Sequence, residues 1–198
     1  MKTKMKSNLK QFIAIALLIP SLTLMALNKK NSNIVLQKNV SYIQKVTPPV
    51  TDLHTAVLKN DIKAVKEHIK AKSDLNIKEA MGGSTPLISA ALFGKTEIAK
   101  LLINAGANLN IQNNDGSTAL ITAAFFCRPE IVKILLAKKA NKTIKNKYGQ
   151  TAFESVSMPF NQVKPVYETL GNALSPLGLK LDMSYIEKTR PTIAKLLK

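Results

Sequence analysis

Two adjacent stretches of the chain carry the same order of hydrophobic and polar positions. The first is STPLISAALFGKTEIAKLLINAGANLNIQNNDG, residues 84–116, and the second is STALITAAFFCRPEIVKILLAKKANKTIKNKYG, residues 117–149. Both are 33 residues long, and they align without a gap. A fixed period of this size is the sequence signature of a solenoid built from stacked repeats. We therefore expect residues 84–149 to contain two copies of one structural unit.

Each unit predicts two short helices with one apolar face. Residues 86–93 carry Leu87, Ala90 and Ala91, whose spacing of three and four places them on one side of a helix. Residues 96–104 show the same spacing of apolar positions. A glycine follows the second helix, and a polar run that ends in Asp-Gly follows the glycine, which predicts a turn between units.

These residues resemble the ankyrin repeat. The family pattern TPLHxAAxxGxxEIVxxLLxxGAxxN is met by TPLISAALFGKTEIAKLLINAGANLN, with Ile88 where the family prefers histidine. A copy upstream, TDLHTAVLKNDIKAVKEHIKAKSDLN, covers residues 51–76 and has His54 at the family's histidine position. In the family this imidazole ties the loop between repeats to the helix, so the resemblance implies the same role for His54.

The resemblance implies an all-α ankyrin-repeat solenoid over residues 51–170. The expected repeats are residues 51–83, 84–116, 117–149 and a degenerate copy over 150–170. In the degenerate copy, Val166 and Leu170 are expected to supply the outer helix. Residues 171–198 are expected to form a helical C-terminal cap, in which Pro191 separates two short helices.

The exit loop of the third copy departs from the family pattern. Lys138-Lys139 stand where the second copy has Ala105-Gly106, and Lys72-Ser73 take this place in the first copy. A lysine in a left-handed conformation is less favourable than glycine by roughly 1 kcal/mol. We expect a strained loop with a solvated charge there.

The N-terminus has the pattern of an export signal. Four lysines within the first ten residues precede an uncharged run of sixteen residues from Phe12 to Leu27. As a helix this run is about 24 Å long, which is short of a hydrocarbon layer of roughly 30 Å. Residues 1–27 are thus either a cleaved signal peptide or an uncleaved signal anchor. We expect a bacterial-type exported protein of the periplasm or cell envelope, with residues 28–50 as a polar linker.

Catalytic chemistry finds little support in the sequence. Cys127 is the only cysteine, so an internal disulfide is excluded, and its apolar neighbours predict a buried thiol. The two histidines, His54 and His68, lie 14 residues apart and do not form a metal set; His68 is expected on a helix surface. No phosphate-binding loop or nucleophile motif is present. We predict a protein that is not an enzyme and has no cofactor.

Binding to another protein is the function that the repeats favour. Ankyrin-like stacks bind through the loop tips and the inner helices, where the core does not dictate the residue. The candidate contact residues on the inner helices are Ser89, Leu92, Phe93, Thr122, Phe125 and Phe126. Those at the loop tips are Asn113, Asn114, Lys145, Lys147 and Tyr148. The apolar members either form an exposed partner site or pack beneath the C-terminal segment.

Charge adds an alternative function. The chain carries +17, and +13 remains without residues 1–27. Residues 128–147 contain seven basic side chains against the single Glu130. This is either a solvated basic face or a site for an acidic protein partner, and the alternative is an electrostatic binder of an anionic membrane or envelope polymer. We expect a monomer, no nucleic acid, and membrane contact only through an uncleaved N-terminal segment.

Overall fold

The computed structural model describes residues 48–198, which lie in one compact unit. Residues 1–47, which include the predicted export signal and most of the predicted linker, lie outside the described part. The described residues contain helices and no strand. The helices are α3 (Leu53–Leu58), α4 (Ile62–Lys70), α5 (Pro86–Leu92), α6 (Thr96–Asn104), α7 (Ala119–Phe125), α8 (Pro129–Ala137), α9 (Ala152–Ser157), α10 (Phe160–Leu174), the short 3₁₀ helix η2 (Ser175–Leu177) and α11 (Met183–Leu197).

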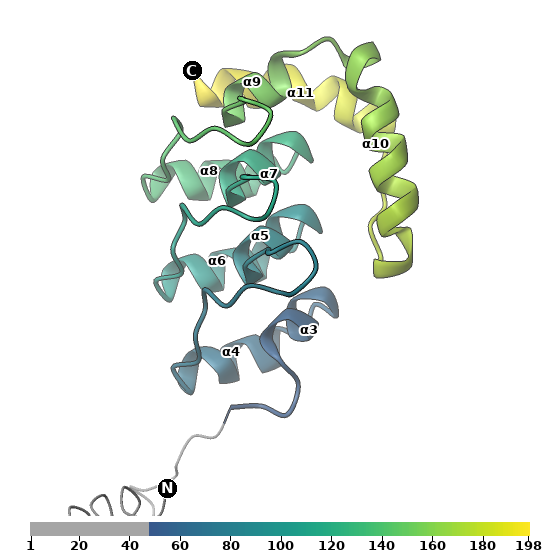
Figure 1. Cartoon of the computed structure of the whole chain (residues 1–198). Helices are drawn as coiled ribbons and strands as arrows, with labels where there is room; N and C mark the ends of the chain where they lie inside the picture. The colour runs from purple at the N-terminus through teal and green to yellow at the C-terminus, as the bar shows by residue number, and fades with distance from the viewer. Residues whose placement is uncertain (1–47) are drawn as a thin grey trace, which may run out of the picture. The chain divides into compact units, whose positions relative to one another are not determined.

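The helices stack in two rows (Figure 1). The inner row is α3, α5, α7 and α9, and each of these helices contacts the next one in the row. The outer row begins with α4, α6 and α8, and each outer helix also packs on the inner helix before it in the chain. This arrangement confirms the predicted all-helical solenoid, because one helix pair per repeat adds to the stack.

The inner helices begin at polar residues that cap their first turn. Thr85, Thr118 and Thr151 each accept a hydrogen bond at the side-chain oxygen from the backbone N–H three residues later, at 3.3 Å. Asp52 does the same for α3, at 3.0 Å from the N–H of Thr55. Such caps stabilise a helix by about 1 kcal/mol. The repeated threonine of the sequence therefore sets where each inner helix starts.

The exit loops confirm the expected left-handed lysines. Gly106 has φ +89°, and the equivalent Lys72 and Lys139 have φ of +54° and +61°. Lys138 ends α8 in the right-handed region, with φ −94°, so only the second lysine of the pair is strained. Each strained lysine destabilises its loop by about 1 kcal/mol relative to glycine.

The core lies between the two rows. Ile98 and Leu102 of α6, and the equivalent Ile131 and Leu135 of α8, are fully buried. Small alanines of the inner helices are buried opposite them, which lets the helices approach closely. Leu101, which was expected on the same face, is only half-buried.

The prediction for the fourth repeat is wrong in its second half. Val166 lies in α10 and is 47% exposed, so the segment with Val166 and Leu170 does not supply the outer helix. The outer position is filled by α11, which contacts α8 and α9 as α8 contacts α6 and α7. A longer buried stripe explains this choice, because Ile186, Ile193 and Leu197 of α11 are all at most 3% exposed.

The fourth repeat is therefore discontinuous. Its inner helix α9 and its outer helix α11 are separated by an insertion, residues 159–182, which carries α10. The predicted boundary at residue 170 is wrong, and α11 is part of the last repeat. Pro191 does not divide α11, contrary to the prediction. Because Pro191 and the preceding turn at Glu187 are exposed, water can hydrate the carbonyl that proline leaves unpaired.

The inserted helix α10 is a poor helix by its own sequence. Pro165 and Gly171 both lie in its interior. Relative to alanine, proline destabilises a helix interior by about 3 kcal/mol and glycine by about 1 kcal/mol. Only Val163 and Tyr167 of its 15 residues are buried. We infer that α10 is held in place by a few contacts with the rest of the fold.

Candidate functional site

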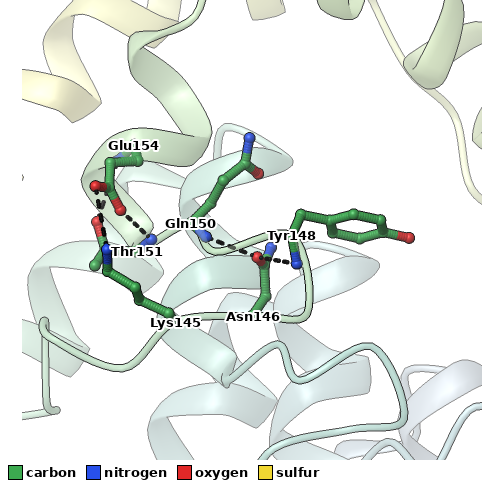
Figure 2. A network of polar contacts seen from close by, with 6 residues as sticks. All are labelled: Lys145, Asn146, Tyr148, Gln150, Thr151 and Glu154. Atoms are coloured by element: carbon green, nitrogen blue, oxygen red, sulfur yellow. Dashed lines mark hydrogen bonds and ion pairs between the residues drawn. The ribbon is translucent and has the colours of Figure 1, made fainter.

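The loops between repeats are built on polar side chains that turn back onto their own backbone (Figure 2). Asn146 accepts hydrogen bonds from the N–H groups of Tyr148 and Gln150, both at 3.0 Å. Asn113 does the same one repeat earlier, with the N–H groups of Asp115 and Ser117 at 3.0 and 2.8 Å. These bonds satisfy loop backbone groups that no helix pairs.

Neighbouring loops are also joined to each other. The N–H of Asn114 donates to the carbonyl of Gly82 at 2.8 Å, and its side-chain amide donates to Met81 at 3.2 Å. The N–H of Lys147 donates to the carbonyl of Asp115 at 2.9 Å. The predicted contact residues Asn113 and Asn114 thus hold the loops together, and their polar groups are already paired within the stack.

The tip of the third loop differs, because its side chains face solvent. Tyr148 is 75% exposed, and its ring points away from the hydrogen-bond network in Figure 2. Lys147 beside it is exposed as well. Lys145 lies 3.8 Å from Glu154, which also accepts from the N–H of Thr151, and that hydrogen bond lowers the pKa of Glu154. Tyr148 and Lys147 are the predicted tip residues whose side chains stay free for a partner.

Other exposed apolar side chains lie on the first of these loops. Met81 is 90% exposed at the tip of the loop between α4 and α5, and Ile77 in the same loop is 50% exposed. We call Ile77, Met81, Lys147 and Tyr148 the loop edge. Ile77 and Met81 were not among the predicted contact residues, because the sequence does not distinguish a loop methionine in solvent from one that folds onto the core.

The inner-helix positions fall into two groups. Ser89 and Thr122 are both 7% exposed and face the packed stack. Leu92 and Phe93, at the end of α5, are half-buried and keep part of their surface in solvent. Phe125 is half-buried, and Phe126 is buried. The four apolar residues therefore do not form one exposed patch.

Tyr167 of α10 covers the two phenylalanines of the third repeat. Its ring stacks on Phe125 with centroids 4.5 Å apart and meets Phe126 edge-on at 6.4 Å. Its hydroxyl donates to the carbonyl of Phe125 at 2.6 Å, and the tyrosine has no exposed surface. Of the two alternatives for these rings, packing beneath the C-terminal segment holds for Phe125 and Phe126.

A buried arginine holds the tyrosine from the other side. Arg190 of α11 is 3% exposed; its Nη1 donates to the hydroxyl of Tyr167 at 2.7 Å and its Nη2 to the carbonyl of Met158 at 2.8 Å. Among residues 48–198, no carboxylate forms an ion pair with Arg190. Burial raises the pKa of Tyr167 to about 12, so the phenol keeps its proton and donates it to Phe125.

Sequence reasoning missed Tyr167 and Arg190, although one signal was present. Of the chain's 29 basic residues only Arg128 and Arg190 are arginines. Both are placed between helices: Arg128 lies against Gly94 and donates to the carbonyl of Leu92 at 3.3 Å. A planar guanidinium makes several hydrogen bonds at once, so rare arginines in a lysine-rich chain indicate structural positions.

The histidines are both structural. The Nε2 of His54 donates to the carbonyl of Ile77 at 3.1 Å, which confirms the expected tie between loop and helix. His68 is not on the surface, as was predicted, but is 5% exposed. Its Nε2 donates to the carbonyl of Thr51 at 2.8 Å, and its Nδ1 lies 3.0 Å from the hydroxyl of Ser73. The chain segment that leads into α3 covers His68, and this closure could not be inferred from helix periodicity.

The remaining candidate chemistry is also accounted for by packing. Cys127 is buried as expected, and burial raises the pKa of its thiol to about 11. Among residues 48–198, no cluster of three or more histidine, cysteine or acidic side chains could hold a metal ion. In the same range, no helix combines the length and apolar character needed to cross a membrane.

The basic third repeat is partly engaged with the fold. The Nζ of Lys142 donates to the carbonyl groups of Leu197 and Lys198 at 3.1 and 3.3 Å, where it caps the last turn of α11. Lys133 pairs with Glu130 at 2.8 Å. The lysines of this repeat are therefore in part structural, and they do not all form one free surface.

Comparison with known proteins agrees with this architecture. A family described as ankyrin repeats (3 copies) matches residues 53–146. Among solved structures, the crystal structure of the ankyrin repeat domain of Bcl-3, described as a unique member of the IkappaB protein family, is similar at 28% sequence identity and a TM-score of 0.51. The similarity covers 54% of this chain and 46% of that one, so this chain spans about half of its length. No curated protein matches the chain.

Ankyrin stacks are in general scaffolds for protein–protein interaction, and their extended surface of loops and inner helices carries the binding residues. The described helices of this chain follow the same order of inner helix, outer helix and loop in each of the first three units. Residues 53–146 are three ankyrin repeats, and the chain folds as an all-helical ankyrin-repeat solenoid.

Proposed function

We propose that this protein is an exported, non-catalytic module that binds another protein through its loop edge and the inner-helix face of its second repeat. The observation that carries the proposal is the solvent exposure of Tyr148 and Met81 on a stack whose loop backbone is otherwise paired. A large apolar side chain in solvent at a rigid loop tip loses little conformational freedom on binding. Such side chains are the usual anchors of protein interfaces.

The inner-helix face extends this surface. Leu92 and Phe93 end α5 and are partly open to solvent, whereas the equivalent Phe125 and Phe126 are covered by Tyr167. A partner that contacts the loop edge can reach Leu92 and Phe93 without moving α10. We therefore assign the apolar part of the binding face to the second repeat.

Export is proposed on the sequence of residues 1–27 alone. A basic N-terminus followed by a short apolar run is typical of a secretory signal. The intact mass of the protein from the cell envelope fraction tests both export and cleavage. Recovery of the uncleaved chain from the cytosol alone would contradict this part of the proposal.

The electrostatic alternative is not favoured. Lys142 caps α11, and Lys145 lies within ion-pair distance of Glu154, so two of the five lysines invoked for it are engaged with the fold. Exposed lysines that remain contribute little each at physiological salt, because exposed charges are screened beyond about 8 Å.

A paired substitution tests the binding surface. We expect Phe93→Ser with Tyr148→Ser to reduce partner recovery in affinity purification by roughly 30-fold or more, since interface anchors contribute about 2 kcal/mol or more each. Tyr185→Ser is the matched control, because Tyr185 is 45% exposed on α11, away from the loops. Quantitative mass spectrometry of the recovered proteins measures the loss. Equal recovery with all three variants would contradict the assignment of this surface.

A further inference from the structure

The insertion in the fourth repeat places a helix where a partner would otherwise bind. α10 begins after Pro159 and ends in η2, and both flanks are anchored in the stack, through α9 on one side and α11 on the other (Figure 1). Gly178 follows η2 with φ +89° and has open space around it. The insertion can therefore swing away from the repeats while α9 and α11 stay in place.

The contact that keeps α10 in place is small. Val163 and Tyr167 are its only buried residues, and its interior proline and glycine weaken the helix itself. Tyr167 provides the specific part, because it stacks on Phe125, covers Phe126 and bonds to a backbone carbonyl. A segment with few buried contacts opens locally at a lower free energy than the whole domain unfolds.

The surface beneath α10 is matched to a tyrosine side chain. Two phenylalanine rings receive its ring, the carbonyl of Phe125 accepts its hydroxyl hydrogen at 2.6 Å, and Arg190 donates to its hydroxyl oxygen at 2.7 Å. A phenylalanine would leave the buried guanidinium short of a partner. A carboxylate would satisfy Arg190 but would meet the Phe125 carbonyl without a hydrogen to donate.

We propose that α10 is an internal ligand of the inner-helix face, and that a tyrosine-bearing segment of a protein partner competes with Tyr167 for the surface of Phe125, Phe126 and Arg190. This inference rests on the proposed function in taking the inner-helix face as the binding face. It adds a second binding position, on the third repeat, which is closed in the free protein and opens when α10 is displaced.

Hydrogen exchange on the full chain, measured by mass spectrometry, tests the opening. We expect amides of α10 to exchange faster than those of α7, α8 and α11 in the wild type. Tyr167→Ala should accelerate exchange in α10 by about tenfold or more, because it removes an aromatic stack and two hydrogen bonds. Val166→Ala, an exposed residue of the same helix, should change it little. Exchange of α10 only together with the whole stack would overturn the proposal.

A peptide added in trans tests the chemistry of the site. The probe is a synthetic peptide of residues 159–176, with a second peptide that has alanine in place of its tyrosine. We expect the first peptide to protect the amides around Phe125 and Phe126 in the Tyr167→Ala chain, and the second to give no protection. Protection by neither peptide, or by both equally, would refute the tyrosine site. Neither experiment uses a natural partner, so its result is separate from the purification that tests the proposed function.

Discussion

We expect Leu135→Asp to abolish the cooperative thermal unfolding of this protein. Leu135 lies in the centre of α8 and has no exposed surface. The substitution removes a buried side chain and places a carboxylate among apolar groups, which together destabilise a domain by more than about 4 kcal/mol. That is most of the stability of a domain whose free energy of unfolding is about 5–15 kcal/mol. Circular dichroism during heating measures the transition.

Ala137→Asp is the control for this substitution. It introduces the same carboxylate into the same helix, but Ala137 is exposed. We expect a loss of at most about 1 kcal/mol there, from the carboxylate near the helix C-terminus. A Leu135→Asp chain that unfolds at the wild-type temperature would show that α8 does not pack as an outer helix.

Removal of residues 183–198 should destabilise the stack almost as strongly. Ile186, Ile193 and Leu197 are buried against the last two repeats, and each such side chain contributes roughly 1.5–3 kcal/mol. Their loss uncovers α8 and leaves α9 without its outer helix. We expect a fall of on the order of 5 kcal/mol in the free energy of unfolding, measured with urea.

The matched variant keeps α11 and changes only exposed side chains, with Glu187, Lys188 and Thr192 replaced by alanine. We expect this variant to unfold at nearly the wild-type urea concentration. If the truncated chain were as stable as this variant, α11 would be a dispensable tail, and the discontinuous fourth repeat would be incorrect.

The first three repeats could be predicted from the sequence because their pattern is local. A threonine cap, a pair of alanines and a pair of leucines recur at a fixed spacing, and each has a direct physical effect on the same unit. The left-handed lysine at position 139 followed from the same alignment. Nothing beyond one repeat and its neighbour was needed for these conclusions.

The fourth repeat could not be predicted in the same way, because an insertion breaks the period. Val166 and Leu170 have helical spacing, and they lie nearer in the chain to α9 than Ile186 and Ile193 do. Which of the two segments fills the outer position depends on how much apolar surface each buries against α8. That is a property of packing between distant segments, and a sequence period does not contain it.

The candidate site was predicted in part for the same reason. Spacing correctly located Asn113 in a loop, but only the structure gives the two backbone N–H groups that its side chain pairs with. Spacing also placed Phe125 and Phe126 on the inner-helix face, where Tyr167, more than 40 residues later, covers them. Tyr148 stayed free because it lies at a loop tip that no later segment reaches.

The central claim is that this protein binds a partner protein through the loop edge and the inner-helix face. A photoreactive amino acid placed singly at Tyr148 or at Phe93 in the producing cells tests it directly, with Lys100 and Lys133 on the outer helices as control positions. The account predicts a discrete covalent adduct with the same protein from Tyr148 and Phe93, and none from the outer-helix positions. Adducts from Lys100 and Lys133 in place of Tyr148 and Phe93 would contradict it.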